Sequence, residues 1–321
     1  MMTRHEAVVA WRLFELTWIL LAAVCAVFAL SLALTDFSID PLGVWALCGV
    51  VALYAGFAYY NAKAPHRGNP TIVFMLGSFA QTILITGVMT PITYVAAATA
   101  LPMRDASLYA IDQALHLDWR SYFYFVHDRP LLIGLFARAY SMIGFQVLIV
   151  PLVLAAAGRF RRLQQYVLAL ILALLVTTVV STAFPAMGLY YHLGLTPADH
   201  PNLFPASYYD YLRDMPAVRD GSLRHLNIFS LTGVLTFPSF HAATAVLYAW
   251  AVAPVRWVGP IAIVINAIMF FSTPIGGGHY FVDLIAGTAV TVVAIAAARL
   301  VDRLVNRAHP ASKVATATQP A

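Results

Sequence analysis

The sequence has very little charge and almost no cysteine. Only 10% of its 321 residues are Asp, Glu, Lys or Arg, whereas a soluble domain carries roughly 25%. Hydrophobic residues make up 61% of the chain, and the mean hydropathy is +0.78. This composition excludes a soluble globular domain and predicts an integral membrane protein built from helical spans of about 20 residues.

The two cysteines, Cys25 and Cys48, lie in apolar runs and lack the C-x-x-C spacing of a metal or redox site. We interpret them as small hydrophobic residues. The net charge of +5 does not indicate a nucleic-acid partner, because the basic residues are scattered through short polar breaks. The basic N-terminal stretch precedes an apolar run of full span length, which we interpret as a retained first span.

Apolar runs separated by polar breaks predict an all-α fold, a polytopic membrane helix bundle of about eight transmembrane helices. The expected spans are residues 15–34, 43–61, 72–98, 131–157, 164–184, 239–254, 257–274 and 279–301. We expect residues 1–68 to hold an accessory N-terminal helix pair and residues 69–305 to form a six-helix core. Residues 306–321 are polar and rich in small side chains, which predicts a disordered tail.

Lys and Arg are unevenly divided between the polar breaks. If the N-terminus is cytoplasmic, the inner segments hold Arg4, Arg12, Lys63, Arg67, Arg159, Arg161, Arg162, Arg256, Arg299, Arg303, Arg307 and Lys313. The longer outer segments hold Arg104, Arg120, Arg129, Arg213, Arg219 and Arg224. This asymmetry predicts an inner or plasma membrane protein with both termini in the cytoplasm.

Two of the outer segments are long. Residues 104–129 place apolar side chains at helical spacing and polar ones between them, which predicts one or two amphipathic helices at the outer interface. The aromatic residues expected at headgroup level are Trp119, Tyr122, Phe123 and Tyr124. Residues 185–237 form the second long segment, and a connection of this length in a tight bundle is more often functional than idle.

Two motifs place histidines at the outer starts of spans. In "TFPSFHAATAV", Ser239 is a candidate N-cap and His241 follows in the first helical turn. In "GGGHYFVDLIAG", His279 opens the last span and Asp283 follows at i+4 on the same helix face. The carboxylate is expected to hold one ring nitrogen and leave the other bare, an arrangement typical of an activated nucleophile or base.

The same helix starts suit an anion such as phosphate. Helix N-termini offer free N–H groups and a positive dipole end. Glycine lets backbone amides approach an anion closely, so we expect phosphate contacts from Ser239, Gly277 and Gly278. The alternative interpretation of the three glycines at 276–278 is a tight turn between spans.

Together, "PSFHAA" and "GGGHYFVDLIAG" resemble the second and third motifs of the type 2 phosphatidic acid phosphatase superfamily. The chain is most similar to its inositol phosphorylceramide synthase-like (inositolphosphotransferase) branch, as "LDWRSYFYFVHDRPLL", "AYSMIGFQ" and "FPAMGLYY" also indicate. The resemblance covers roughly residues 70–300. It implies an enzyme that acts on a lipid phosphate or phospholipid at the outer membrane face and needs no metal or other cofactor.

The resemblance also implies a role for each residue of the paired motifs. His279 would attack phosphorus and form a phosphohistidine, while Asp283 would hold its ring tautomer. His241 would protonate the leaving alkoxide. Water resolving the intermediate gives a lipid phosphatase and a lipid hydroxyl gives a phosphotransferase; the sequence leaves both open.

The basic residues of the wider superfamily pattern are missing. Thr273 stands where S-R-x5-H-x3-D has arginine, and "VVSTAFPAMG" has no counterpart of the basic motif K-x6-R-P. The candidate replacements as phosphate ligands are Arg138, Arg219 and Arg224, and Tyr190 is a further candidate for lining the site. A structural ion pair is the alternative for Arg138, and solvated loop charges are the alternative for the other two arginines.

Two other functions belong to different classes. A proton-coupled transporter would need ionisable residues strung through the bilayer, whereas the two motif histidines gather at one membrane face. A catalytically silent, lipid-binding member of the family is the second alternative, because two basic motifs are missing. The sequence carries no signal for the oligomeric state.

Overall fold

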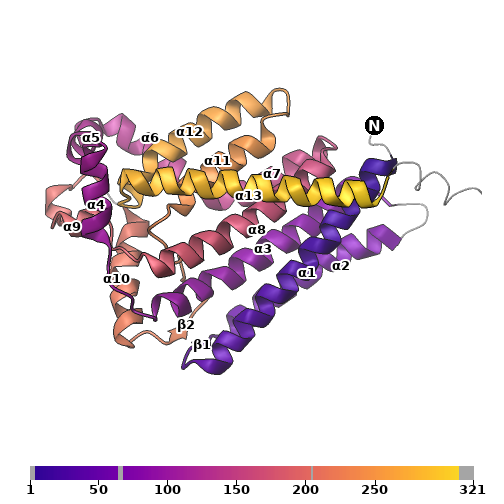
Figure 1. Cartoon of the computed structure of the whole chain (residues 1–321), viewed down its shortest axis with the longest axis horizontal. Coiled ribbons are helices and arrows are strands. Elements are labelled where there is room, and N and C mark those ends of the chain that lie inside the picture. Colours follow the sequence, from indigo (N-terminus) through magenta and orange to yellow (C-terminus); the bar gives the residue numbers. More distant parts are fainter. Residues whose placement is uncertain (1–3, 64–67, 204, 311–321) are drawn as a thin grey trace, which may run out of the picture.

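The chain forms an elongated bundle of long helices (Figure 1) in a computed structural model that describes residues 4–63, 68–203 and 205–310. These residues form thirteen α-helices, and their only strands are two residues long, β1 (Ser38–Ile39) and β2 (His225–Leu226). The two strands pair in parallel. The predicted all-α, polytopic membrane bundle is confirmed.

Six helices are long and apolar enough to cross a membrane, which makes this an integral membrane protein. They are α1 (Arg4–Leu34), α2 (Pro41–Lys63), α3 (Pro70–Ala97), α8 (Phe160–Ala183), α12 (Val258–Gly276) and α13 (Phe281–Ala308). α13 continues past the expected end of the core at residue 305. The rest of the expected tail, residues 311–321, lies outside the described residues.

The span expected at 131–157 is broken. It consists of α6 (Pro130–Ser141) and α7 (Ile143–Ala156), which are bent against each other by 58°. Ser141 and Gly144 flank the break, and such small residues are frequent sites of helix kinks. The end of α6 lies against the motif that contains His241.

The span expected at 239–254 is short. Its helix, α11 (Phe240–Val252), has 13 residues and is therefore about 20 Å long, less than the roughly 30 Å of a bilayer core. Pro254 follows the helix end, and because proline has no backbone N–H it cannot donate the next helical hydrogen bond. His241 lies in the first turn of α11 and is partly buried.

α8 lies at the centre of the bundle, and α1, α3, α11 and α13 pack around it (Figure 1). Its residues Leu163, Tyr166 and Val167 are fully buried. Phe14 of α1 packs in the same hydrophobic core. The division into an accessory pair at 1–68 and a core at 69–305 stays a prediction.

At the end of the bundle that holds His241 and His279, here called the site end, shorter helices cover the long ones (Figure 1). They are α4 (Asp105–Ala114), α5 (Trp119–His127), α9 (Leu189–His192), the 3₁₀ helix Pro197–Asp199 and α10 (Ala206–Asp220). The expected amphipathic segment thus forms two helices, α4 and α5.

Trp119 and Phe123 do not face outward as an interfacial aromatic belt would, because they are only 1% and 2% exposed. The Trp119 indole N–H donates to the carbonyl of Pro274 at 3.2 Å, and its ring stacks on Phe123. α5 therefore turns its aromatic face onto the α12–α13 connection instead of outward. Tyr124, by contrast, is 54% exposed.

At the opposite end of the bundle, α8 and α13 are joined by a two-pronged ion pair. Arg161 donates from Nε and Nη2 to the two carboxylate oxygens of Asp302, at 2.5 and 2.6 Å. Asp302 is buried, whereas Arg161 is partly exposed. Arginine and carboxylate match each other geometrically in such a pair, which ties the two helices together.

We expect Asp302→Ala to lower the stability of the protein by about 2 kcal/mol, because the partly buried Arg161 loses its counter-charge. The measurement is the thermal unfolding midpoint of the detergent-solubilised protein. Glu15→Ala, which breaks the exposed Arg12–Glu15 pair, serves as the control and should change little. Equal midpoints for the two variants would contradict the importance assigned to the Arg161–Asp302 pair.

Candidate active site

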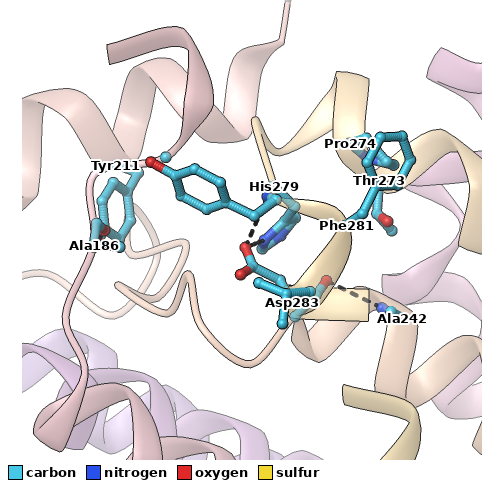
Figure 2. Close-up of polar contacts among 12 residues, drawn as sticks. Ala186, Tyr211, Ala242, Thr273, Pro274, His279, Phe281 and Asp283 are labelled. Atoms are coloured by element: carbon cyan, nitrogen blue, oxygen red, sulfur yellow. Dashed lines mark hydrogen bonds and ion pairs between the residues drawn. The ribbon is translucent and has the colours of Figure 1, made fainter. Parts of the chain in front are cut away.

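His279 and Asp283 form a buried pair at the start of α13. Nδ1 of His279 lies 3.0 Å from Asp283 Oδ2, and the same oxygen accepts the Tyr280 backbone N–H at 3.0 Å. Figure 2 shows the imidazole turned toward the carboxylate. Because an ionised carboxylate only accepts hydrogen bonds, the contact requires the proton on Nδ1, and in the neutral imidazole Nε2 is then unprotonated.

Asp283 also connects this pair to the helix that carries His241. Its backbone oxygen accepts the N–H of Ser239 at 3.0 Å, and Ser239 is the N-cap of α11. A Cβ atom added at Gly287 would lie 2.4 Å from the Ser239 carbonyl oxygen, so glycine is needed where α11 and α13 approach each other. One buried residue therefore positions both histidine motifs.

The Ser239 hydroxyl caps α11 by accepting the N–H of Ala242 at 3.3 Å. The residue is fully buried, and it does not line the cavity described below. The expected N-cap geometry is therefore present. Its expected contact with phosphate is not supported, because the hydroxyl faces its own helix.

His241 stacks on Tyr140, which comes from the end of α6. The two ring centroids are 3.9 Å apart and the planes differ by 11°. Within the described residues, neither ring nitrogen of His241 makes a hydrogen bond to the protein. Its nitrogens are thus available to a substrate.

Both histidines line one cavity of about 230 Å³ between α3, α7, α8 and α11. Its polar walls are hydroxyl side chains, namely Thr86, Thr90, Thr93, Tyr140, Ser207, Tyr211, Thr232, Thr236 and Tyr248. None of the described residues that line it is Asp, Glu, Lys or Arg. The described part of the chain also has no group of three or more His, Cys, Asp or Glu that could hold a metal ion.

A second cavity of about 330 Å³ adjoins the first, and the described residues that line it carry no formal charge apart from His241 if protonated. The two cavities share His241 and Tyr140. The second has apolar walls that include Phe136, Ile143 and Ile275. His241 is therefore reached from two sides.

The glycines before His279 have different roles. Gly277 lines the cavity, as expected for a residue close to a bound anion. Gly278 has a φ of +66°, a value that glycine adopts without strain. Its carbonyl accepts the Leu189 N–H at 2.8 Å, and a Cβ atom there would lie 2.9 Å from the Tyr190 ring.

Tyr190 lies behind this turn, outside the lining of the two cavities. Its hydroxyl donates to the Ile275 carbonyl at 2.9 Å, and it is fully buried. Trp119 packs edge-on against its ring. Tyr190 thus supports the glycine turn, and its candidacy for lining the site is not supported.

The three candidate arginines do not enter the cavity. Arg138 is exposed and donates to the Gly134 carbonyl of its own helix. Arg224 pairs with Asp36 at 3.0 Å and lies over the Phe37 ring. Neither expectation of a phosphate contact is supported, because both side chains point elsewhere.

Arg219 lies closer to the site cavity than the other two candidate arginines. It donates to the carbonyls of Ala100 and Leu101, just beyond α3. It borders a cavity of about 10 Å³ that shares the walls Thr93 and Leu235 with the site cavity. It stands next to the site without lining it.

Sequence reasoning missed two aspartates that hold the site in place. Asp105 accepts from the N–H groups of Met187 and Gly188 and, at 2.8 Å, from the Tyr280 hydroxyl. Asp112 accepts from the N–H groups of Phe281 and Val282, both at 2.8 Å. Both aspartates are buried.

A signal for these aspartates was present in the sequence. Asp105 and Asp112 are seven residues apart, so they share one face of α4 with Leu108, which is also buried. Burial raises the pKa of Asp112, and its two backbone hydrogen bonds oppose that shift. α4 therefore stabilises the start of α13 by supplying carboxylate acceptors for the free backbone N–H groups there.

We expect Asp105→Ala to loosen the site end, since three buried donors lose their acceptor at about 1–3 kcal/mol each. Hydrogen exchange followed by mass spectrometry should show faster exchange at residues 185–190. Asp105→Asn keeps one oxygen acceptor and should give a smaller effect, and Asp128→Ala, at the exposed end of α5, is the control. Unchanged exchange in Asp105→Ala would contradict the assigned role.

A model of the PAP2 superfamily matches residues 106–297. No curated protein and no solved structure matches the chain. The matched range contains both histidine motifs, the broken span and the covering segments of the site end. The chain belongs to the PAP2 superfamily.

Proposed function

We propose that the protein is a membrane lipid phosphatase or lipid phosphotransferase that works through a phosphohistidine intermediate. The observation that carries the proposal is the buried His279–Asp283 pair beside His241 in one hydroxyl-lined cavity. Membership of the PAP2 superfamily, whose members are generally phosphatases and phosphotransferases, supports the same chemistry.

In the first step, Nε2 of His279 attacks phosphorus while the bond from phosphorus to the lipid oxygen breaks. Asp283 keeps the proton on Nδ1 and stabilises the positive charge that develops on the ring. His241, in its protonated form, gives its proton to the leaving alkoxide. The products are a lipid alcohol and a phosphohistidine.

In the second step, an oxygen nucleophile attacks the phosphohistidine, and neutral His241 takes its proton. The P–N bond breaks and His279 returns to its starting form. If water is the nucleophile, the net reaction is hydrolysis; if a lipid hydroxyl attacks, the reaction is headgroup transfer. The cover of α4, α5 and α10 over the site end favours transfer, because it limits the access of water.

The form of the motifs supports a place in the inositol phosphorylceramide synthase-like branch. The segment His279-Tyr280-Phe281-Val282-Asp283 has the H-Y-x-x-D form, and Thr273 replaces the arginine of the wider family. None of the described residues that line the cavity is Lys or Arg, which accords with this departure. On this assignment the substrate is a phospholipid or lipid phosphate of the sphingolipid or glycerolipid type.

We further propose that the site end faces the periplasm or cell exterior. The opposite end carries Arg4, Lys63 and Arg159 near the helix ends, as cytoplasmic membrane boundaries do. Both termini are then cytoplasmic, and the lipid reaches the cavity from the outer leaflet.

We expect His279→Ala to lower activity by about 10³-fold or more, because the nucleophile is removed. The assay measures phosphate release and phosphate transfer from a panel of lipid phosphates and phospholipids by the purified protein. His116→Ala, on the exposed turn between α4 and α5, is the control. Wild type, but not His279→Ala, should yield an acid-labile labelled phosphoprotein, and activity that survives the substitution would exclude His279 as nucleophile.

We expect the effect of His241→Ala to depend on the leaving group. A lipid alkoxide needs a proton as it leaves, whereas nitrophenolate does not. Phosphoenzyme formation should therefore fall steeply with lipid substrates and only slightly with a nitrophenyl phosphate ester. Equal losses with both substrates would contradict the assignment of His241 as the acid.

A further inference from the structure

Tyr140 occupies an unusual place between the two histidine motifs. Its ring stacks on His241. On the glycine turn, a Cβ atom added at Gly276 would lie 2.6 Å from Cδ2 of the tyrosine, so the ring fills the space that a side chain there would take. Tyr140 itself is only 8% exposed. The Tyr140 ring thus packs against both the glycine turn before His279 and the imidazole ring of His241.

The Tyr140 hydroxyl lies beside the nucleophilic nitrogen. A Cβ atom added at Gly277 would be 2.7 Å from Tyr140 Oη and 2.8 Å from His279 Nε2. The two polar atoms therefore border the same small space above Gly277. Both side chains line the site cavity, so a phosphoryl group approached by Nε2 has the phenol as its neighbour.

The break between α6 and α7 produces this position. Tyr140 lies at the end of α6, next to the 58° bend. α6 packs against α12, whose last residue is Gly276, so the chain bends directly beside the glycine turn.

The lack of Lys and Arg among the described residues of the cavities makes the Tyr140 hydroxyl important. A phosphoryl group in transfer carries negative charge on its nonbridging oxygens, which need donors or cations. The described residues that line the two cavities include no Lys or Arg. Among the hydroxyls of the described residues that line the cavity, that of Tyr140 lies nearest to the space above Gly277, which Nε2 also borders.

We propose that Tyr140 is a catalytic residue of this site. Its hydroxyl donates a hydrogen bond to a nonbridging oxygen of the phosphoryl group that His279 attacks, in place of a cationic side chain. Its ring holds His241 in line with the leaving oxygen. This inference rests on the proposed phosphoryl-transfer function.

The test compares Tyr140→Phe, which keeps the stacked ring, with Tyr140→Leu, which removes both ring and hydroxyl. Tyr166→Phe is the matched control, because Tyr166 is fully buried in α8 and its hydroxyl has no partner among the described residues. The substrates are the lipids that the wild type turns over. Orthovanadate, which mimics the five-coordinate phosphorus, serves as an inhibitor.

We expect Tyr140→Phe to lower kcat about 10²-fold, as loss of one oxyanion donor does, with KM changed less than about threefold. Vanadate inhibition should weaken in parallel with kcat, since the donor acts in the transition state. Tyr140→Leu should lose more activity, and Tyr166→Phe should behave as wild type. Single-turnover formation of the phosphoenzyme should slow by the same factor as kcat.

An active wild type whose kcat and vanadate inhibition survive Tyr140→Phe overturns the role of Tyr140 and leaves the proposed function standing. Equal losses in Tyr140→Phe and Tyr166→Phe overturn it as well, because they indicate a general packing effect. A wild type that forms no phosphoenzyme with any substrate overturns the proposed function itself, and the role of Tyr140 with it.

Discussion

The arrangement of the site end depends on one buried carboxylate, that of Asp283. Its side chain holds the ring of His279, and its backbone oxygen holds the N-cap of the helix that carries His241. A carboxylate inside a membrane bundle is costly unless it has partners. Its Oδ2 has two donors, whereas Oδ1 has no partner among the described residues. Burial of an oxygen without a partner costs free energy, which the two hydrogen bonds to Oδ2 offset in part.

The covering helices supply the other half of this arrangement. α4 directs Asp105 and Asp112 inward, where they accept from the connection before α9 and from the first turn of α13. α5 adds Trp119, which contacts Pro274 and Tyr190. The turn that contains Gly277 and Gly278 is thus enclosed by hydrogen bonds and aromatic rings. An enclosure of this kind fixes the reacting groups before a substrate arrives.

The cavity differs from the expectation of a cationic phosphate site. Arg138 and Arg224 are occupied elsewhere, and Arg219 stands next to the cavity without lining it. The polar groups that line the cavity beside the two histidines are hydroxyl side chains and the backbone at Gly277, and they stand among apolar residues such as Val147 and Leu174. Neutral hydrogen-bond donors stabilise an anion when several of them point at it, and each hydrogen bond is stronger where water is excluded. The absence of the superfamily's basic motifs from the sequence therefore agrees with a site in which neutral hydrogen-bond donors contact the anion.

The sequence alone determined the membrane bundle, the helix start at Ser239 and the pairing of His279 with Asp283, whereas the last helix begins at Phe281 and not at the expected His279. These features depend on apolar run length, capping chemistry and i+4 spacing, which are local properties of the chain. Only the tertiary structure decided that the fourth span breaks, that the aromatic face of α5 turns inward and that Tyr140 lies between the two histidines. Asp105 and Asp112 had a visible i+7 pattern, but their partners lie more than 75 residues away along the chain. Such contacts depend on how helices pack, and residue spacing carries no information on that.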